Sequence, residues 1–81
     1  MKRLPRKNAV YTPDSATTIL INYQKEKQIL EVEYTGGRVY HYYRVPPEIW
    51  NEYVEIIKAG RSSGTYVNQQ IKPRFGDYEE V

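Results

Sequence analysis

The stretch from Leu30 to Ile71 constrains the fold of this chain more than any other part of its 81 residues. Its first strand, expected over residues 28–34, alternates apolar and acidic side chains. The alternating residues are Leu30, Glu31, Val32, Glu33 and Tyr34. A period of two is typical of a strand with one buried face and one solvated face. Gly36-Gly37 then supplies the positive φ angles of a hairpin turn, and residues 38–44 are expected to form the returning strand.

The loop of this hairpin decides which tyrosines are buried, because a slip of one residue moves every side chain of a strand to the other face. A two-residue glycine loop puts Tyr40 and Tyr42 on the face of the glutamates. A three-residue loop over residues 35–37 pairs Tyr34 with Arg38 and puts both tyrosines on the apolar face. We prefer the three-residue loop. Its core face consists of Leu30, Val32, Tyr34, Tyr40 and Tyr42, and its outer face carries Val39, His41 and Tyr43.

Two helices are predicted after the hairpin. Val45-Pro46-Pro47 ends the strand and begins the first helix, since proline is tolerated in the first turn of a helix. Gly60 is a fitting stop for this helix. Ser62 or Ser63 can cap a second, shorter helix that runs to about Ile71. The apolar face of the first helix consists of Ile49, Tyr53, Ile56 and Ile57.

A further strand is expected before the hairpin, over residues 17–23, with Ile19, Ile21 and Tyr23 on one face. The sequence therefore predicts an α+β fold. This fold is a small antiparallel sheet of about three strands, a β-meander, with two C-terminal helices packed on one face.

The charges divide the chain into three parts. Residues 1–13 form a basic N-terminal arm, residues 14–75 a nearly neutral domain, and residues 76–81 an acidic tail. Charged, aperiodic ends of this kind are usually solvated and disordered, so we expect residues 1–8 to contact no core residue. A nearly neutral body lacks the broad basic surface that is usual for a nucleic-acid binder.

Several function classes are excluded or disfavoured. The chain has one histidine, His41, and no cysteine, so nucleophilic catalysis has almost no candidates and no metal-ligand spacing exists. We therefore expect a protein that is not an enzyme and uses no metal or cofactor. No apolar run approaches the length of a membrane span. Arg6, Lys7 and Asn8 follow the first five residues in place of the apolar stretch of a signal peptide, so we expect no signal peptide. With the absence of cysteine, this favours a cytoplasmic protein without membrane partners.

One constellation suggests phosphate binding. A Ser/Gly turn that opens a helix presents free backbone N–H groups and a positive dipole end, which suit an anion. The candidate residues are Arg61, Ser62, Ser63, Gly64, Tyr66, Asn68, Lys72 and Arg74. The alternative is an ordinary helix cap with solvated basic residues. A second candidate surface is the outer face of the sheet, with His41 and Tyr43.

The order and spacing of residues across 14–75 resemble the KTSC domain. The matching residues are Ser15, Tyr23, Leu30-Glu31-Val32, Tyr34, Gly37, Val39-Tyr40, Tyr42, Val45-Pro46, Trp50, Ser62, Gly64, Tyr66, Asn68 and Ile71, and the central Tyr-x-Tyr motif is Tyr40 and Tyr42. This small domain occurs at the C-terminus of some lysyl-tRNA synthetases and as a stand-alone protein of bacteria and phages. The resemblance implies a role in RNA binding and implies no catalytic residues.

Three functions follow as expectations. The first is a non-enzymatic module that binds a phosphate-bearing ligand, RNA before any other, with tyrosine rings stacking on bases and Arg or Lys on phosphates. The second is an oligomeric, phage-type sponge that sequesters a nucleotide immune signal. The third is a protein–protein adaptor that uses the outer sheet face or an exposed strand edge. The expected partner is thus RNA or a nucleotide. The second function also implies that the chain forms a homo-oligomer.

Overall fold

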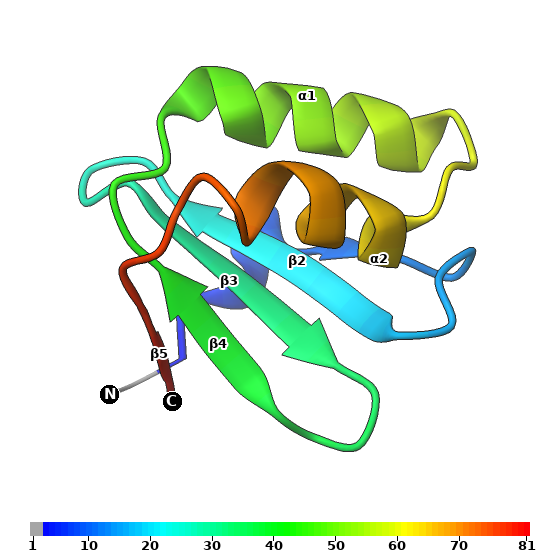
Figure 1. The fold of residues 1–81 in the computed structure, drawn as a ribbon, viewed down its shortest axis with the longest axis horizontal. Helices are drawn as coiled ribbons and strands as arrows, with labels where there is room; N and C mark the ends of the chain where they lie inside the picture. The colour runs from blue at the N-terminus through cyan, green and yellow to red at the C-terminus, as the bar shows by residue number, and fades with distance from the viewer. Residues whose placement is uncertain (1–2) are drawn as a thin grey trace.

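The computed structural model describes residues 3–81 and shows one antiparallel sheet with the two α-helices on one side (Figure 1). Its five strands lie in the order β1-β2-β3-β4-β5. They are β1 (Val10–Tyr11), β2 (Thr18–Gln24), β3 (Ile29–Tyr34), β4 (Val39–Tyr42) and β5 (Tyr78–Glu80). The helical elements are η1 (Arg6–Asn8), α1 (Pro47–Lys58), α2 (Ser63–Tyr66) and η2 (Val67–Ile71), and the last is a π-helical turn.

The α+β class and the antiparallel sheet are confirmed, but the expected number of three strands is too low. The two missed strands are the short edges β1 and β5. β1 pairs with β2 through Val10 and Ile21, and β5 pairs with β4 through Tyr78 and Tyr42. Strands of two and three residues are too short to show an alternating sequence pattern. They form because the neighbouring strand offers unpaired backbone N–H and C=O groups.

The three-residue hairpin loop is confirmed. Leu30 pairs with Tyr42 and Val32 with Tyr40. The backbone N–H of Tyr34 donates to the carbonyl of Arg38 at 2.8 Å, which closes the loop over residues 35–37. Gly36 and Gly37 both have a φ of 95°, in the region that glycine adopts without strain.

The main core lies between the inner face of the sheet and the helices α1 and α2, which cover that face (Figure 1). The sheet contributes Ile21, Tyr23, Leu30, Val32 and Tyr42, and the helices and the loop before α1 contribute Val45, Ile49, Tyr53, Tyr66, Val67 and Ile71. Tyr40 is half-buried at the margin of this core. The expected common face of Ile19, Ile21 and Tyr23 is wrong at its first member. A bulge between Thr18 and Leu20 breaks the alternation and leaves Ile19 38% exposed.

The two expected helices are present, and their ends agree with the sequence signals. Pro47 and Glu48 lie in the first turn of α1, and Gly60 follows its end with a φ of 79°. Ser62 is the N-cap of α2, and its side chain accepts from the backbone N–H of Thr65 at 3.3 Å. The last turn widens into η2, where Lys72 N–H donates to the Val67 carbonyl at 2.9 Å.

The expectation that residues 1–8 contact no core residue is wrong for residues 3–8, and residues 1–2 lie outside the described part of the chain. Leu4 is only 8% exposed against the outer face of the sheet. That face is apolar as well as acidic, because Leu20, Ile29 and Val39 are buried outside the main core. Apolar side chains on both faces of a sheet need cover on both sides. The N-terminal segment provides this cover opposite the helices.

Candidate functional site

A hollow that joins four aromatic rings and two cations lies at the side of the sheet where β5 pairs with β4. It has a volume of about 400 Å³. Its lining consists of Tyr34, Arg38, Tyr40, Tyr42, Lys72 and Tyr78, and we call it the tyrosine pocket. Two features of the sheet bring the tyrosines of this pocket together. The hairpin register aligns Tyr40 and Tyr42 with the inner face, and β5 adds Tyr78 opposite Tyr42.

The tyrosines of this pocket hold one another in place. Ring centroids lie 5.7 Å apart for Tyr34 and Tyr40, 5.9 Å for Tyr40 and Tyr78, and 5.6 Å for Tyr42 and Tyr78. The hydroxyls of Tyr34 and Tyr42 are hydrogen-bonded at 2.9 Å. Edge and tilted contacts at these distances are favourable aromatic geometries. The pocket is therefore largely formed before any ligand arrives.

The charge of the lining comes from its two cations. Burial raises the pKa values of Tyr34 and Tyr42, so both hydroxyls stay neutral near pH 7. Lys72 Nζ lies 5.6 Å from the centroid of the Tyr34 ring. Among residues 3–81, neither Arg38 nor Lys72 forms an ion pair. The pocket thus combines flat apolar surfaces with two cations that have no carboxylate partner in the described chain.

The anion site predicted around Ser62 is only partly assembled. Arg61, Ser62, Tyr66 and Arg74 line a second hollow of about 500 Å³, together with Glu52, Ile56, Thr65, Gln69 and Gln70. Lys72 lines the tyrosine pocket instead, and the exposed Asn68 lines neither hollow. Glu52 accepts a hydrogen bond from the Tyr66 hydroxyl at 2.6 Å, so this hollow carries an anionic group of its own.

The backbone N–H groups expected to receive the anion have intramolecular partners. Gly64 N–H donates to Ser15 Oγ at 3.2 Å, and Thr65 N–H donates to Ser62 Oγ. Ser63 is fully buried, and its Oγ is hydrogen-bonded to the Tyr53 hydroxyl at 2.6 Å. A Cβ on Gly64 would lie 2.1 Å from Thr17 Oγ1. Of the N–H groups expected to be free at the opening of this helix, the one of Gly64 is thus paired, as is that of the following Thr65, and Ser62, Ser63 and Gly64 make structural contacts.

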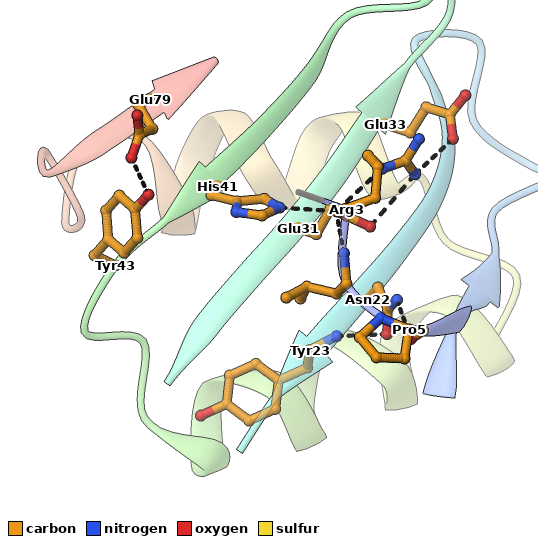
Figure 2. Close-up of polar contacts among 10 residues, drawn as sticks. Arg3, Pro5, Asn22, Tyr23, Glu31, Glu33, His41, Tyr43 and Glu79 are labelled. Atoms are coloured by element: carbon orange, nitrogen blue, oxygen red, sulfur yellow. Dashed lines mark hydrogen bonds and ion pairs between the residues drawn. The ribbon is translucent and has the colours of Figure 1, made fainter. Parts of the chain in front are cut away.

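The outer-face candidates His41 and Tyr43 do not form an open surface. The His41 side chain is fully buried, and its Nε2 lies 2.7 Å from Glu31 Oε2 (Figure 2). Tyr43 is half-buried, and its hydroxyl donates to Glu79 of β5. Burial and this neighbouring carboxylate raise the pKa of Tyr43 to about 12. Both side chains thus make contacts within the fold.

Sequence reasoning missed Tyr34, Arg38 and Tyr78 as members of one site. The preferred hairpin register already placed Tyr34 on the face of Tyr40 and Tyr42, so this triplet could have been read as a platform. Tyr78 gave no signal, because its contribution depends on the pairing of β5 with β4. Across residues 3–81, no group of three His, Cys, Asp or Glu side chains is placed to hold a metal ion. No helix of this described part is long and apolar enough to cross a bilayer.

The fold and pocket define a small α+β domain with a helix-covered antiparallel sheet. Residues 14–75 match the family model of the KTSC domain, and the chain belongs to this family.

Relatives show where such domains occur. A protein of Tsukamurella paurometabola is 39% identical over 62 residues, which cover 76% of this chain and 87% of that protein. An uncharacterised protein of Stutzerimonas stutzeri is 40% identical and covers 75% of this chain and 80% of its own. A lysine–tRNA ligase of Nostoc punctiforme is 30% identical over 78% of this chain, which corresponds to 10% of the ligase.

A solved structure has the same fold. The crystal structure of a KTSC domain protein from Yersinia pestis superposes with a TM-score of 0.66. The match covers 83% of this chain and 87% of the other, at 22% sequence identity.

Proposed function

We propose that this domain is a non-enzymatic binding module for a phosphate-bearing ligand, single-stranded RNA before any other, and that the tyrosine pocket is its binding site. The observation that carries the proposal is the lining of this pocket. Four tyrosines and two cations without carboxylate partners in the described chain surround one hollow. The proposed place of action is the cytoplasm of a bacterium, or of the host cell if a phage encodes the protein.

The lining suits both parts of a nucleotide. Bases of single-stranded RNA stack on aromatic rings, and every base has a face that can do so. Among the four tyrosines of the pocket, Tyr78 is the exposed one, with 55% of its surface accessible. Arg38 and Lys72 flank the rings and can neutralise phosphates, with the guanidinium able to form bidentate contacts.

RNA is preferred as the ligand for two reasons. A lysine–tRNA ligase contains a related segment, and a binding module for RNA is useful in such a protein. Arg38, Lys72 and Tyr78 of the lining are also exposed to solvent, so an RNA strand bound there can continue beyond one nucleotide. A free nucleotide is the second candidate. The volume of about 400 Å³ favours it, since this is the size of a small-ligand pocket.

The test compares charge loss at the two hollows. We expect the double variant Arg38→Gln/Lys72→Gln to bind a labelled six-nucleotide RNA about tenfold more weakly than the unmodified protein in fluorescence anisotropy. Losing two phosphate contacts should also reduce the slope of log K against log salt by about 1.4. The matched control is Arg61→Gln/Arg74→Gln, which removes the same charge from the second hollow.

Each outcome has a distinct reading. Weaker binding by both double variants to the same extent would show a nonspecific charge effect and contradict the pocket assignment. A loss confined to the Arg61/Arg74 control would move the site to the second hollow. Tight binding of nucleoside monophosphates, with no gain from a longer RNA, would favour the nucleotide sponge over the RNA module.

A further inference from the structure

The outer face of the sheet holds residues 3–5 through a contact to each of them (Figure 2). The Arg3 guanidinium reaches both glutamates, with Nε 3.1 Å from Glu31 Oε2 and Nη2 3.0 Å from Glu33 Oε1. Leu4 N–H donates to Glu31 Oε2 at 3.0 Å, and its side chain is buried. The Pro5 carbonyl accepts from Asn22 Nδ2 at 2.9 Å.

These contacts match the way in which extended peptides are recognised. One receptor group takes a backbone N–H, one takes a backbone carbonyl, a carboxylate pair takes a cation, and an apolar surface takes an aliphatic side chain. The receptor side chains Asn22, Glu31 and Glu33 belong to β2 and β3, inside the segment that matches the family model. The residues that occupy the face lie before that segment.

Two of the three receptor side chains, Glu31 and Asn22, are also held by groups of the sheet. Glu31 is fixed by His41 Nε2 at 2.7 Å, and both side chains are fully buried. Asn22 Oδ1 accepts from Tyr23 N–H at 2.8 Å, which directs the amide Nδ2 toward Pro5. Neither contact involves residues 3–5, so Glu31 and Asn22 each have a partner in the sheet that is independent of the occupant.

The charge of this face selects the occupant. Glu31 and Glu33 lie side by side, and Arg3 is the cation that pairs with both in the described chain. A buried carboxylate without a cationic partner is costly, so an occupant without a cation at this position would bind poorly. We propose that the outer face is a receptor for an extended peptide with the pattern Arg–aliphatic–Pro. Residues 3–5 are its intramolecular occupant, and a segment of a partner protein with this pattern displaces them.

The experiment uses the full chain and a synthetic peptide with the sequence of residues 1–8, acetylated and amidated at its ends. The intact protein should bind this peptide weakly, because the tethered segment competes at an effective concentration in the millimolar range. The double variant Arg3→Ala/Leu4→Ala loosens the tethered segment. We expect it to bind the peptide about tenfold more tightly than the intact protein does. The readout is the chemical shift of the Asn22 side-chain amide and of the Glu31 backbone amide.

Two controls test the recognition itself. A peptide of the same composition in scrambled order should not shift these signals. In the Arg3→Ala/Leu4→Ala background, Glu33→Gln should weaken binding about fivefold through loss of a charged hydrogen bond, whereas Glu55→Gln on the exposed side of α1 should not.

Each outcome of the peptide titration either supports or overturns the proposal. If the double variant is unfolded alone, millimolar peptide should restore the folded spectrum. A variant that is folded but insensitive to peptide would overturn the proposal, and so would an unfolded variant that the peptide does not restore. A concentration-dependent dimer of the intact protein that requires Arg3 would overturn the assignment to a partner, because a second copy would then be the occupant.

Discussion

Glu31 is the residue on which the outer half of the fold depends. Its carboxylate is fully buried and accepts hydrogen bonds from Arg3, Leu4 and His41. Burial alone would raise the pKa of Glu31, but the hydrogen bonds from Arg3 and His41 and from the Leu4 backbone outweigh it and lower the pKa. The charge of Glu31 is thus stabilised by groups from two other segments, residues 3–4 and β4.

The lowered pKa of Glu31 predicts a loss of stability in acid. The unfolded chain binds a proton to this carboxyl near its ordinary value of 4.5, whereas the folded chain binds it only at lower pH. Stability from Glu31 is therefore fully present above pH 4.5 and is lost as pH falls through the folded pKa. Urea titrations at several pH values should show this decline, and Glu31→Gln should reduce it. An equal decline in the Glu31→Gln variant would mean that other carboxylates are responsible.

Gly64 illustrates how a short motif can be structural. Its Cβ position lies 2.1 Å from Thr17 Oγ1, so Gly64→Ala forces the turn at residues 15–17 away from α2. We expect a loss of about 1 to 3 kcal/mol in the free energy of unfolding, measured by urea denaturation. Gly76→Ala is the control, because nothing lies within 4 Å of its Cβ position. Equal stability of the two variants would contradict the close approach of these segments.

At the scale of elements, the regular parts of the fold follow from the sequence and the edges do not. Alternation and the glycine turn identified β3, β4 and their register. Proline, glycine and serine marked the ends of α1 and α2. The N-terminal segment was missed because its hold on the sheet comes from single residues, Arg3 and Leu4, within an aperiodic, basic stretch. β5 was missed because an acidic tail gives no strand signal until β4 offers a free edge.

The N-terminal segment is predicted to stabilise the fold. Leu4→Ala should lower the free energy of unfolding by about 2 kcal/mol, since a mostly buried leucine is truncated beside Glu31. Thermal denaturation measures this effect. Lys7→Ala, at an exposed position of η1, should change the melting temperature little. Melting temperatures that do not differ would mean that residues 3–8 do not cover the sheet in solution.

The two edge strands provide a matched pair of exposed tyrosines. Tyr78 on β5 is 55% exposed and lines the tyrosine pocket, whereas Tyr11 on β1 is 61% exposed and does not line it. Tyr78→Ala should weaken RNA binding by about 1 to 3 kcal/mol, the contribution of one stacked base. Tyr11→Ala should leave the affinity unchanged. Isothermal titration of both variants checks this, and equal losses would rule out stacking on Tyr78.

On the scale of the whole molecule, the sheet separates two surfaces of different chemistry. The helices and the tyrosine pocket occupy its inner side, and the acidic face that holds residues 3–5 is on the other. The family assignment was evident from the order and spacing of residues within 14–75. The site was only partly evident, because Arg38 lies far in the sequence from Lys72 and Tyr78. These residues meet only through strand pairing and the position of the end of η2.

The central claim is that the tyrosine pocket receives the ligand, and NMR titration with a six-nucleotide single-stranded RNA tests it most directly. Selective labelling of the tyrosine rings separates the pocket from the rest of the molecule. The account predicts that ring signals of Tyr34, Tyr40, Tyr42 and Tyr78 shift in a saturable way, while Tyr11 and Tyr66 do not. Shifts confined to Tyr66 and to the backbone around Arg61, with the four pocket rings unchanged, would contradict it.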